Sequence, residues 1–506
     1  MTGYLLGVDI GTTACKSVVF DVKGRTIAKA SKEYPIHYPR PGWAEQDADW
    51  WWNSVKMTTK EALRKARSQS EDIIGIGIDS QREAPVALDA HGRKLATSLI
   101  WMDRRTILQT QKIRKLIHLK KVIEATGVPI DPLYSAPKIM WIKEERPSIF
   151  RKTRMFLFPK DYIIYRLTNV ATTDHSMASR TMLYDIRRRK WHDEICQKLG
   201  IPIEMLPSPV DSPKTVGEVS STAAKSTGLG KGTPVVAGGG DRPCEAIGGG
   251  VCELGYINIG SGTSTVMTTP LLKPKVDMKG RIDCCCHVIP DMWEYELPIL
   301  TTGASLRWFR DNFGYEEIEK SEKTGVDPYV YLDALARRVE LGSGSLFYYP
   351  YPMGAKSPKF ASTAKAVFFG ITLIHTKAHL VRAILEGVAF QYAETLELLE
   401  ELGVKVKEAS LVGGEARSQL WNQIKADALS RSIRLPDVED AAALGSAILS
   451  SIGVKVYKNV EDAVKNMVRT RTIYRPRRKE SFMYAAFYEK YKKVYEFLKH
   501  GYDVIA

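Results

Sequence analysis

Two stretches of the sequence, half a chain apart, share a pattern that constrains the fold more than any other feature. Residues 4–9 form an apolar run suited to a β-strand, and a Gly-Thr-Thr turn leads from them to a second such run at residues 17–20. Residues 255–267 repeat this order, with a small polar turn between two β-rich runs. We therefore expect two hairpins, one opening each half of an internally duplicated chain.

Between and after these hairpins, β-suited and helical patterns alternate along the chain. Residues 73–78 and 234–237 are short apolar runs that predict buried strands. Amphipathic spacing predicts helices at residues 49–66, 137–145, 160–167, 379–399, 418–430 and 480–499. This alternation predicts an α/β protein with layered sheets. Three glycines at residues 248–250 precede the second hairpin, so we divide the chain into residues 1–250 and 251–506.

The composition excludes several classes of protein. A chain of 506 residues, 44% hydrophobic and 26% charged, is typical of a globular protein of about two to four domains. No run approaches the roughly 18 apolar residues of a membrane span, and the N-terminus lacks the basic segment of a signal peptide. The seven cysteines are sparse, and three are consecutive, which fits no disulfide framework and favours a cytoplasmic protein. The net charge of +15 lies in short, separate basic runs, so it does not predict nucleic-acid binding.

The turn of the first hairpin has the residues of a phosphate-binding turn. Asp9 lies at a strand end, and Gly11 lets backbone amides approach a ligand. Hydroxyl donors and a positive charge follow, at Thr12, Thr13 and Lys16. Such a turn can cradle phosphate oxygens while Asp9 holds Mg²⁺ directly or through water. An ordinary hairpin turn uses the same residue types and is the alternative.

Two later glycine turns could complete a nucleotide site. The turn at residues 260–264 has the character of the first one without its carboxylate, so two hairpins facing each other across a cleft could clamp one polyphosphate. Residues 411–418 combine a strand, a Gly-Gly turn and the start of a helix. The Gly-Gly turn in residues 411–418 could admit a flat adenine against the backbone, although a single Gly-Gly pair is a weak signal.

Asp241 follows a strand and three glycines, at the point where a helix begins. An aspartate in this place is either the N-cap of the helix or a catalytic base at the carboxyl end of the strand. A cap needs only one oxygen, and three glycines carry an entropic cost that a cap does not require. Because the glycines make sense where a substrate must come close to the backbone, we favour the base.

A polar cluster follows the strand at residues 73–78, where Gln81, Arg82 and Glu83 leave its end together. Paired donors and acceptors of this kind suit the hydroxyl groups of a polyol, and a surface ion pair is the alternative. Trp101 follows another short strand-like run. It can form a wall for the carbon skeleton of the substrate, or it can belong to the core.

In this order, the motifs resemble the FGGY family of carbohydrate kinases, within the actin-like, ribonuclease H-like group of ATPases. The resemblance covers nearly the whole chain. Further phrases that carry it are Pro-Gly-Trp-Ala-Glu-Gln at residues 41–46, Phe-Pro-Lys-Asp at 158–161, Gly-Ala-Lys-Ser-Pro at 354–358 and Ala-Val-Phe-Phe-Gly-Ile at 366–371. The resemblance implies an α/β fold of two actin-like (ribonuclease H-like) lobes, with a cleft between them that binds ATP and Mg²⁺.

The resemblance also implies roles for single residues. Asp9 helps to position the metal ion, and Asp241 matches the catalytic base. Phosphate contacts are implied for Thr12, Thr13, Gly262 and Thr263, and contacts with the adenosine for Gly413, Gly414 and Arg417. The first lobe, residues 1–250, is expected to hold the sugar and the first phosphate turn, and the second, residues 251–506, the nucleotide.

For the substrate, the resemblance points in two directions. The segments at residues 134–141 and 158–162 resemble xylulokinases, whereas the Gln-Arg-Glu motif with Trp101 resembles glycerol kinase. Arg242, beside the matched base, fits neither pattern. It can bind a more oxidised or anionic substrate, or it can turn away into a salt bridge. We expect a ketopentose such as xylulose, then glycerol, then another polyol.

Two functions of other classes remain as alternatives. One is an ATP-driven binding or scaffold protein of the actin-like group, and the other is a nucleic-acid-binding protein, which rests on charge alone. Asp241 and the polar cluster at residues 81–83 favour the kinase, because an ATP clamp needs no base for a hydroxyl group. We expect a small-molecule sugar or polyol as the partner, with no nucleic acid and no membrane. A homodimer is among the assemblies that the sequence allows.

Overall fold

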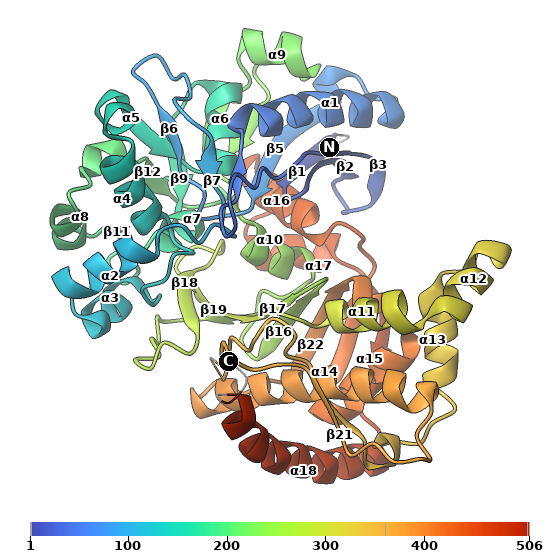
Figure 1. Ribbon diagram of the computed structural model, residues 1–506. Helices are drawn as coiled ribbons and strands as arrows, with labels where there is room; N and C mark the ends of the chain where they lie inside the picture. The colour runs from blue at the N-terminus through green and yellow to red at the C-terminus, as the bar shows by residue number, and fades with distance from the viewer. Residues whose placement is uncertain (1–2, 360, 503, 505–506) are drawn as a thin grey trace. The chain divides into compact units, whose positions relative to one another are not determined.

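The computed structural model describes residues 3–359, 361–502 and 504 (Figure 1). The chain forms two compact units that interleave along the sequence. The first unit holds the residues up to Leu254, with Pro270–Tyr295 and Asp440–Arg469; the second holds Gly255–Thr269, Glu296–Glu439 and the residues from Thr470 on. The division of sugar and nucleotide binding between residues 1–250 and 251–506 stays a prediction.

The first unit is built on a sheet in the strand order β13-β14-β5-β1-β2-β3, in which β15 also pairs with β5. The bounds are Tyr4–Ile10 (β1), Ala14–Asp21 (β2), Thr26–Glu33 (β3), Ile73–Ser80 (β5), Thr215–Glu218 (β13), Pro234–Val236 (β14) and Gly239–Gly240 (β15). β1 and β2 pair antiparallel, which confirms the first predicted hairpin. β5 and β14 follow in parallel, and β13 closes the sheet antiparallel to β14.

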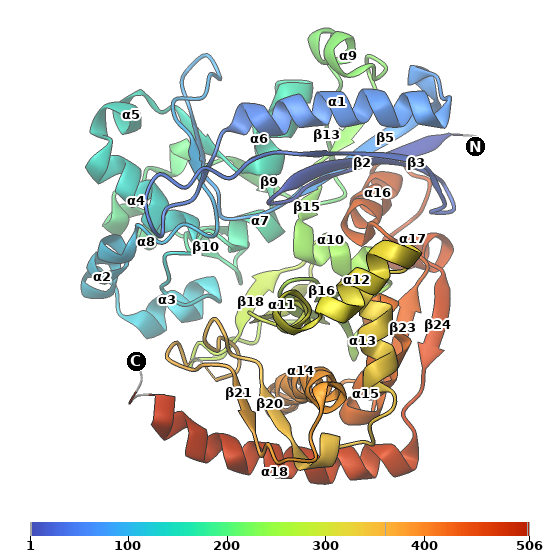
Figure 2. The ribbon, with the colours of Figure 1, turned by 45° about the vertical axis from the view of Figure 1, so that its right-hand side comes forward.

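Two helices pack against this sheet. α1 (Ala48–Ala66) contacts β2 and β3, and α16 (Ala441–Gly453) contacts β1 and β5 (Figure 2). α16 comes so close that only glycine fits beneath it. A Cβ atom on Gly77 would lie 1.8 Å from the carbonyl oxygen of Ser446, and one on Gly7 would lie 2.0 Å from the α16 backbone. These glycines alternate with buried apolar residues, as side chains on the two faces of a strand do.

Short elements make up the rest of the first unit, and among them α4 and α6 confirm two predicted helices. Its further helices are α2 (Ile107–Leu116), α3 (Leu119–Thr126), α4 (Ser135–Glu145), α5 (Pro147–Lys152), α6 (Pro159–Thr168), α7 (His175–Ser179), α8 (Asp193–Leu199), α9 (Ser221–Thr227), α10 (Asp241–Gly248) and α17 (Val460–Met467). Its further strands are β4 (Glu45–Gln46), β6 (Val86–Leu88), β7 (Ser98–Leu99), β8 (Met155–Leu157), β9 (Thr172–Asp174), β10 (Tyr184–Asp185), β11 (Lys190–Trp191), β12 (Ser208–Val210) and β18 (Asp283–Cys286).

The sheet of the second unit repeats the pairing of the first one. Six of its strands follow the order β19-β17-β16-β22-β23-β24, with bounds Trp293–Ile299 (β19), Thr265–Leu271 (β17), Tyr256–Ser261 (β16), Glu408–Gly413 (β22), Ser432–Pro436 (β23) and Thr470–Tyr474 (β24). β17 and β16 form the second predicted hairpin, β22 and β23 follow in parallel, and β24 pairs antiparallel to β23. In the first sheet, the neighbouring strands in the order β2-β1-β5-β14-β13 show the same succession of antiparallel and parallel pairs. The two sheets are therefore duplicates in topology.

The helices of the second unit include the three that were expected in this part of the chain. They are α11 (Gly303–Phe313), α12 (Tyr315–Thr324), α13 (Pro328–Ala336), α14 (Lys377–Glu401), α15 (Gln419–Leu429) and α18 (Arg478–Tyr502), beside a small sheet of β20 (Phe347–Tyr349) and β21 (Val367–Phe369). Tyrosines of α18 pack against α14, where Tyr491 lies 5.1 Å from the ring of Phe390. In the described part of the chain, we find no helix with the length and apolarity that a membrane crossing needs.

Candidate active site

Two carboxylates lie side by side in the first unit, near the carboxyl ends of the parallel strands β1 and β5. Asp9 and Asp79 are partners in the register of these strands. Burial raises the pKa of Asp9 to about 6, although the nearby Lys16 acts in the opposite direction. Burial also raises the pKa of Asp79 well above its usual value, and Asp9 and Asp241 add to this effect. These acidic groups therefore lie close enough to interact, and a cation between them would relieve their repulsion.

The turn after Asp9 is held by hydrogen bonds on both sides. The backbone N–H of Gly11 donates to the carbonyl of Ala14 at 3.0 Å, which closes the hairpin. The indole N–H of Trp101 donates to the hydroxyl oxygen of Thr12 at 2.9 Å, whereas Thr13 is exposed. Trp101 itself is 38% exposed, so it does not belong to the core. The structure thus joins one residue predicted for the substrate to one predicted for the phosphates.

Asp241 is the first residue of α10, and Gly240 is the N-cap of this helix. The capping alternative therefore does not describe Asp241, whose carboxylate accepts a hydrogen bond from the N–H of Arg242 at 2.9 Å. The preceding glycines are required by close contacts: Gly238 has a φ of +65°, and a Cβ atom there would lie 1.9 Å from the carbonyl oxygen of Ile78. The Asp241 side chain remains 27% exposed, as a base that receives a substrate must be.

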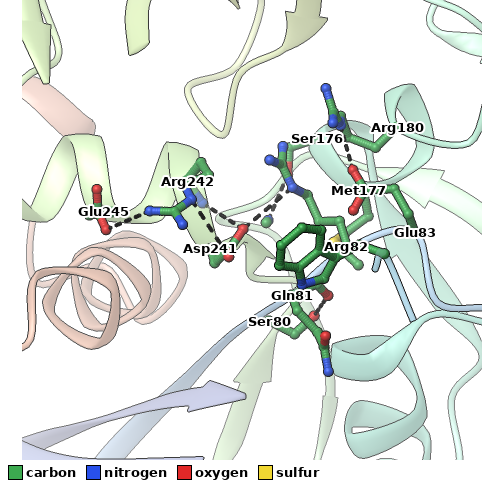
Figure 3. Close-up of polar contacts among 12 residues, drawn as sticks. Ser80, Gln81, Arg82, Glu83, Ser176, Met177, Arg180, Asp241, Arg242 and Glu245 are labelled. Atoms are coloured by element: carbon green, nitrogen blue, oxygen red, sulfur yellow. Dashed lines mark hydrogen bonds and ion pairs between the residues drawn. The ribbon is translucent and has the colours of Figure 1, made fainter. Parts of the chain in front are cut away.

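Two guanidinium groups lie beside Asp241 (Figure 3). Arg82 places its Nε 3.4 Å from Asp241 Oδ1, and its side chain is 5% exposed, so this is no surface ion pair. Arg242 contacts Glu245 at 3.2 Å and lies 3.9 Å from Asp241 Oδ2. Of the two alternatives for Arg242, substrate binding or a salt bridge, this structure shows the salt bridge.

Glu83 takes part in a buried ion cluster that the sequence did not predict. Arg180 bridges Glu83 at 2.6 Å and Asp283 at 2.7 Å, and the hydroxyl of Tyr134 donates to Asp283 at 3.1 Å. Lys138 donates to the backbone carbonyl of Glu83 at 2.8 Å, and burial lowers the pKa of this lysine to about 7. Glu83 is therefore fixed by protein partners before any substrate binds.

Gln81 also has a protein partner. It is buried, and its amide nitrogen donates to the side-chain oxygen of Gln46 at 2.7 Å, while Gln46 donates to the carbonyl of Thr12 at 2.6 Å. Gln81 thus links the end of β5, through Gln46, to the turn that contains Thr12. Of the three residues in the predicted polar cluster, Arg82 is the one that contacts Asp241.

The second unit contains a pocket of about 270 Å³ that includes four of the residues predicted for the nucleotide. It is lined by Gly262, Thr263, Gly303, Leu306, Arg307, Asp327, Tyr329, Val330, Asp333, Gly414, Glu415, Arg417, Ser418 and Trp421. Apolar and aromatic walls suit a flat base, and Arg307 and Arg417 bring positive charge for phosphates. Gly413 is not part of the lining. It has a φ of +90°, and a Cβ atom on it would lie 1.9 Å from the carbonyl oxygen of Ser261, so only glycine fits there.

Sequence reasoning missed the pocket wall that α13 supplies with Tyr329, Val330 and Asp333, together with Asp327, the N-cap of this helix. It also missed Arg180 and Ser176, which lie around Asp241 and Glu83 (Figure 3). No glycine turn or strand end marks these residues. The Phe-Pro-Lys-Asp phrase at residues 158–161 was a usable signal, because its Lys160 lies in a buried cluster behind the Asp241 segment.

The protein is an α/β protein with two sheets of the same topology, each of which begins with a hairpin that has a polar turn. Comparison with known proteins identifies its family. Residues 4–248 match the N-terminal domain, and residues 257–454 the C-terminal domain, of the FGGY family of carbohydrate kinases. The chain therefore belongs to this family and is a phosphotransferase with an alcohol group as acceptor. ATP as the phosphoryl donor follows from the family.

Individual relatives extend over nearly the whole chain. The chain is 30% identical to a xylulose kinase of Bacillus subtilis, over 98% of this chain and 97% of that protein. It is 32% identical to a gluconokinase of the same organism, over 92% and 91%. The crystal structure of xylulose kinase from Rhodospirillum rubrum superimposes with a TM-score of 0.89 at 26% identity, covering 99% of this chain and 100% of that one. The predicted α/β fold with two actin-like lobes is confirmed.

Proposed function

We propose that this kinase transfers the γ-phosphoryl group of ATP to a hydroxyl group of a small sugar, with Asp241 as the general base. The observation that carries the proposal is the placement of a partly exposed carboxylate at the end of a glycine segment, with Arg82 3.4 Å away. A sugar hydroxyl is a poor nucleophile at neutral pH. A carboxylate at hydrogen-bond distance accepts its proton as the bond to phosphorus forms.

Our first candidate for the substrate is a ketopentose such as xylulose. The similarity to a xylulose kinase over 98% of the chain supports it. Trp101, partly exposed, would form the wall for the carbon skeleton, and Arg82 would face the hydroxyl groups. Glycerol, suggested by the Gln-Arg-Glu motif, follows as a smaller polyol, but Gln81 and Glu83 already have protein partners.

Arg242 favours a second candidate, an aldonate such as gluconate. Its guanidinium lies next to the proposed base, and a guanidinium binds a carboxylate through two parallel hydrogen bonds. A substrate carboxylate would compete with Glu245 for it. The similarity to a gluconokinase supports this alternative.

A substrate screen with an Arg242→Gln variant separates the two candidates. ADP release is measured with xylulose, ribulose, gluconate and glycerol, and we expect the highest kcat/KM for xylulose. Arg242→Gln should then change kcat/KM for xylulose by less than about threefold, because a neutral sugar does not need this charge. If gluconate is the preferred substrate and the variant lowers its kcat/KM by about tenfold or more, the aldonate replaces the ketopentose.

For the nucleotide, we propose the pocket of the second unit, with the phosphates reaching Gly262 and Thr263. In the first unit, Gly11, Thr12, Thr13 and Lys16 would complete the phosphate contacts. Mg²⁺ fits the residues present, because Asp9 offers hard oxygen ligands and Mg²⁺ is commonly held by one or two carboxylates plus substrate phosphates. Among the described residues, no three acidic, histidine or cysteine side chains gather as a metal site. When bound, Mg²⁺ neutralises phosphate charge.

The pocket can be tested at Gly414, where an added Cβ atom meets no atom within 4 Å. A side chain there would enter the pocket without displacing the protein. Gly414→Val should therefore raise the KM for ATP by about tenfold or more, while the sugar KM and the Tm stay near those of the parent. Gly414→Ala, as a smaller graded control, should have a smaller effect. Unchanged nucleotide kinetics in both variants would remove the nucleotide from this pocket.

The proposal also covers the cellular location and the oligomeric state of the protein. All seven cysteines are buried and free of disulfides, which agrees with the expected cytoplasmic location. A homodimer stays a prediction, to be measured by light scattering during gel filtration.

A further inference from the structure

The segment that carries Asp241 is held from behind by a buried charged cluster. Lys160, at the start of α6, places its Nζ 2.6 Å from Asp161 and 3.1 Å from Asp174. The same ammonium group donates to the backbone carbonyl of Ala237 at 2.8 Å. The side chains of the three charged residues are completely buried. Ala237 is the residue from which the three glycines lead to Asp241.

A second contact reaches the other end of the glycine segment. The hydroxyl of Ser176, on α7, donates to Asp174 Oδ2 at 2.5 Å and accepts a hydrogen bond from the N–H of Gly240 at 2.9 Å. Gly240 directly precedes Asp241 and caps α10. The carboxylate of Asp174 is therefore linked to both ends of the segment, through Lys160 to Ala237 and through Ser176 to Gly240.

The energetics of this cluster indicate a role in placing the chain. Buried charges are costly, and a buried ion pair is often no more stable than apolar residues of the same volume. Such groups do, however, fix geometry, because each charge needs its partners at defined positions. The chain held here consists of three glycines, which have more backbone freedom than any other residue. The cluster removes that freedom next to the proposed base.

We propose that Lys160, Asp174 and Ser176 are positioning residues that hold Asp241 at the place where it takes the proton from the substrate hydroxyl. This inference rests on the proposed role of Asp241. None of the three residues contacts the substrate in this scheme. They act through the backbone of residues 237–240, and a displacement of about 1 Å at a catalytic group can cost about 10²-fold in rate.

Ser176→Ala tests the proposal with the smallest change, and Ser212→Ala is its matched control. Both serines donate to Asp174 Oδ2, at 2.5 and 2.8 Å, but of these two only Ser176 has a hydrogen bond with Gly240. We expect Ser176→Ala to lower kcat by about 10- to 100-fold, with the KM of sugar and nucleotide within about threefold of the parent. Ser212→Ala should keep kcat within about threefold.

A double variant separates positioning from a general weakening of the fold. In an Asp241→Asn background, the base is already lost, so Ser176→Ala should cause no further loss in kcat. Additive losses, equal losses for Ser176→Ala and Ser212→Ala, or a native kcat for Ser176→Ala would each overturn the positioning role. A native rate for Asp241→Asn alone would instead refute the proposed function. Lys160→Met, if its Tm shows that it folds, should reproduce the effect of Ser176→Ala.

Discussion

Replacing Asp241 by asparagine should lower kcat by about 10²–10⁴-fold while the Tm stays almost unchanged. The amide has nearly the shape of the carboxylate, and its oxygen can still accept the hydrogen bond from the N–H of Arg242. It cannot take up the proton of a sugar hydroxyl. The measurement is steady-state kinetics with the substrate that the screen identifies, beside thermal unfolding of both proteins.

Glu245→Gln is the control for this variant. It removes one negative charge from the same helix, α10, where Glu245 pairs with Arg242 at 3.2 Å. If the loss in Asp241→Asn came from the altered charge of the helix, Glu245→Gln would show a loss of similar size. We expect a change of less than about fivefold, since a partly exposed ion pair contributes little. An Asp241→Asn enzyme that turns over at the parent rate would eliminate the base.

Replacing Asp9 by alanine should lower Mg²⁺-dependent turnover by orders of magnitude, on the order of 10³-fold, because phosphoryl transfer depends on positioning and charge neutralisation. A titration of activity with Mg²⁺ should also require a higher concentration of the ion. Near-parent turnover with Mg²⁺ and ATP would contradict a metal role for Asp9.

The raised pKa of Asp9 gives this prediction a pH dependence. Burial raises the pKa to about 6, so below that pH the carboxyl group is largely protonated and no longer attracts a cation. The Mg²⁺ concentration for half-maximal activity should therefore rise as the pH falls through about 6 and stay constant above about 7. This rise should be absent in Asp9→Ala. An identical pH profile in that variant would assign the titration to another group.

The local patterns in the sequence predicted the parts of the site that lie at strand ends. An apolar run followed by a polar turn is a short-range signal, so Asp9 and the residues at 260–264 could be placed in hairpins. The glycines before Asp241 were explained by a substrate that comes close to the backbone. The structure gives Gly238 another reason, because a Cβ atom there would meet the carbonyl oxygen of Ile78. The reason for the residue types of a hairpin turn lies within a few positions of them, whereas the reason for Gly238 lies in β5, far away in the sequence.

Contacts between distant segments could not be predicted in this way. Arg180 joins Glu83 to Asp283, about a hundred residues away on either side, and Asp283 comes from a segment that returns to the first unit after the second hairpin. Nothing in the local pattern of a single arginine indicates such partners. The pocket wall on α13 was missed for the same reason, because its side chains gain a function only from the elements that they meet.

The interleaving of the two units has a consequence for the order in which the chain folds during translation. α16 covers the face of β1 and β5 where Gly7 and Gly77 lie, yet it begins at residue 441. Until the ribosome has synthesised α16, this glycine-lined face of the sheet is uncovered, because a nascent chain can pack only against segments that have already been made. The first unit, which begins at the N-terminus, therefore cannot complete its packing until α16 has been synthesised. A fragment that ended at residue 254 would lack the helix that covers one face of its sheet.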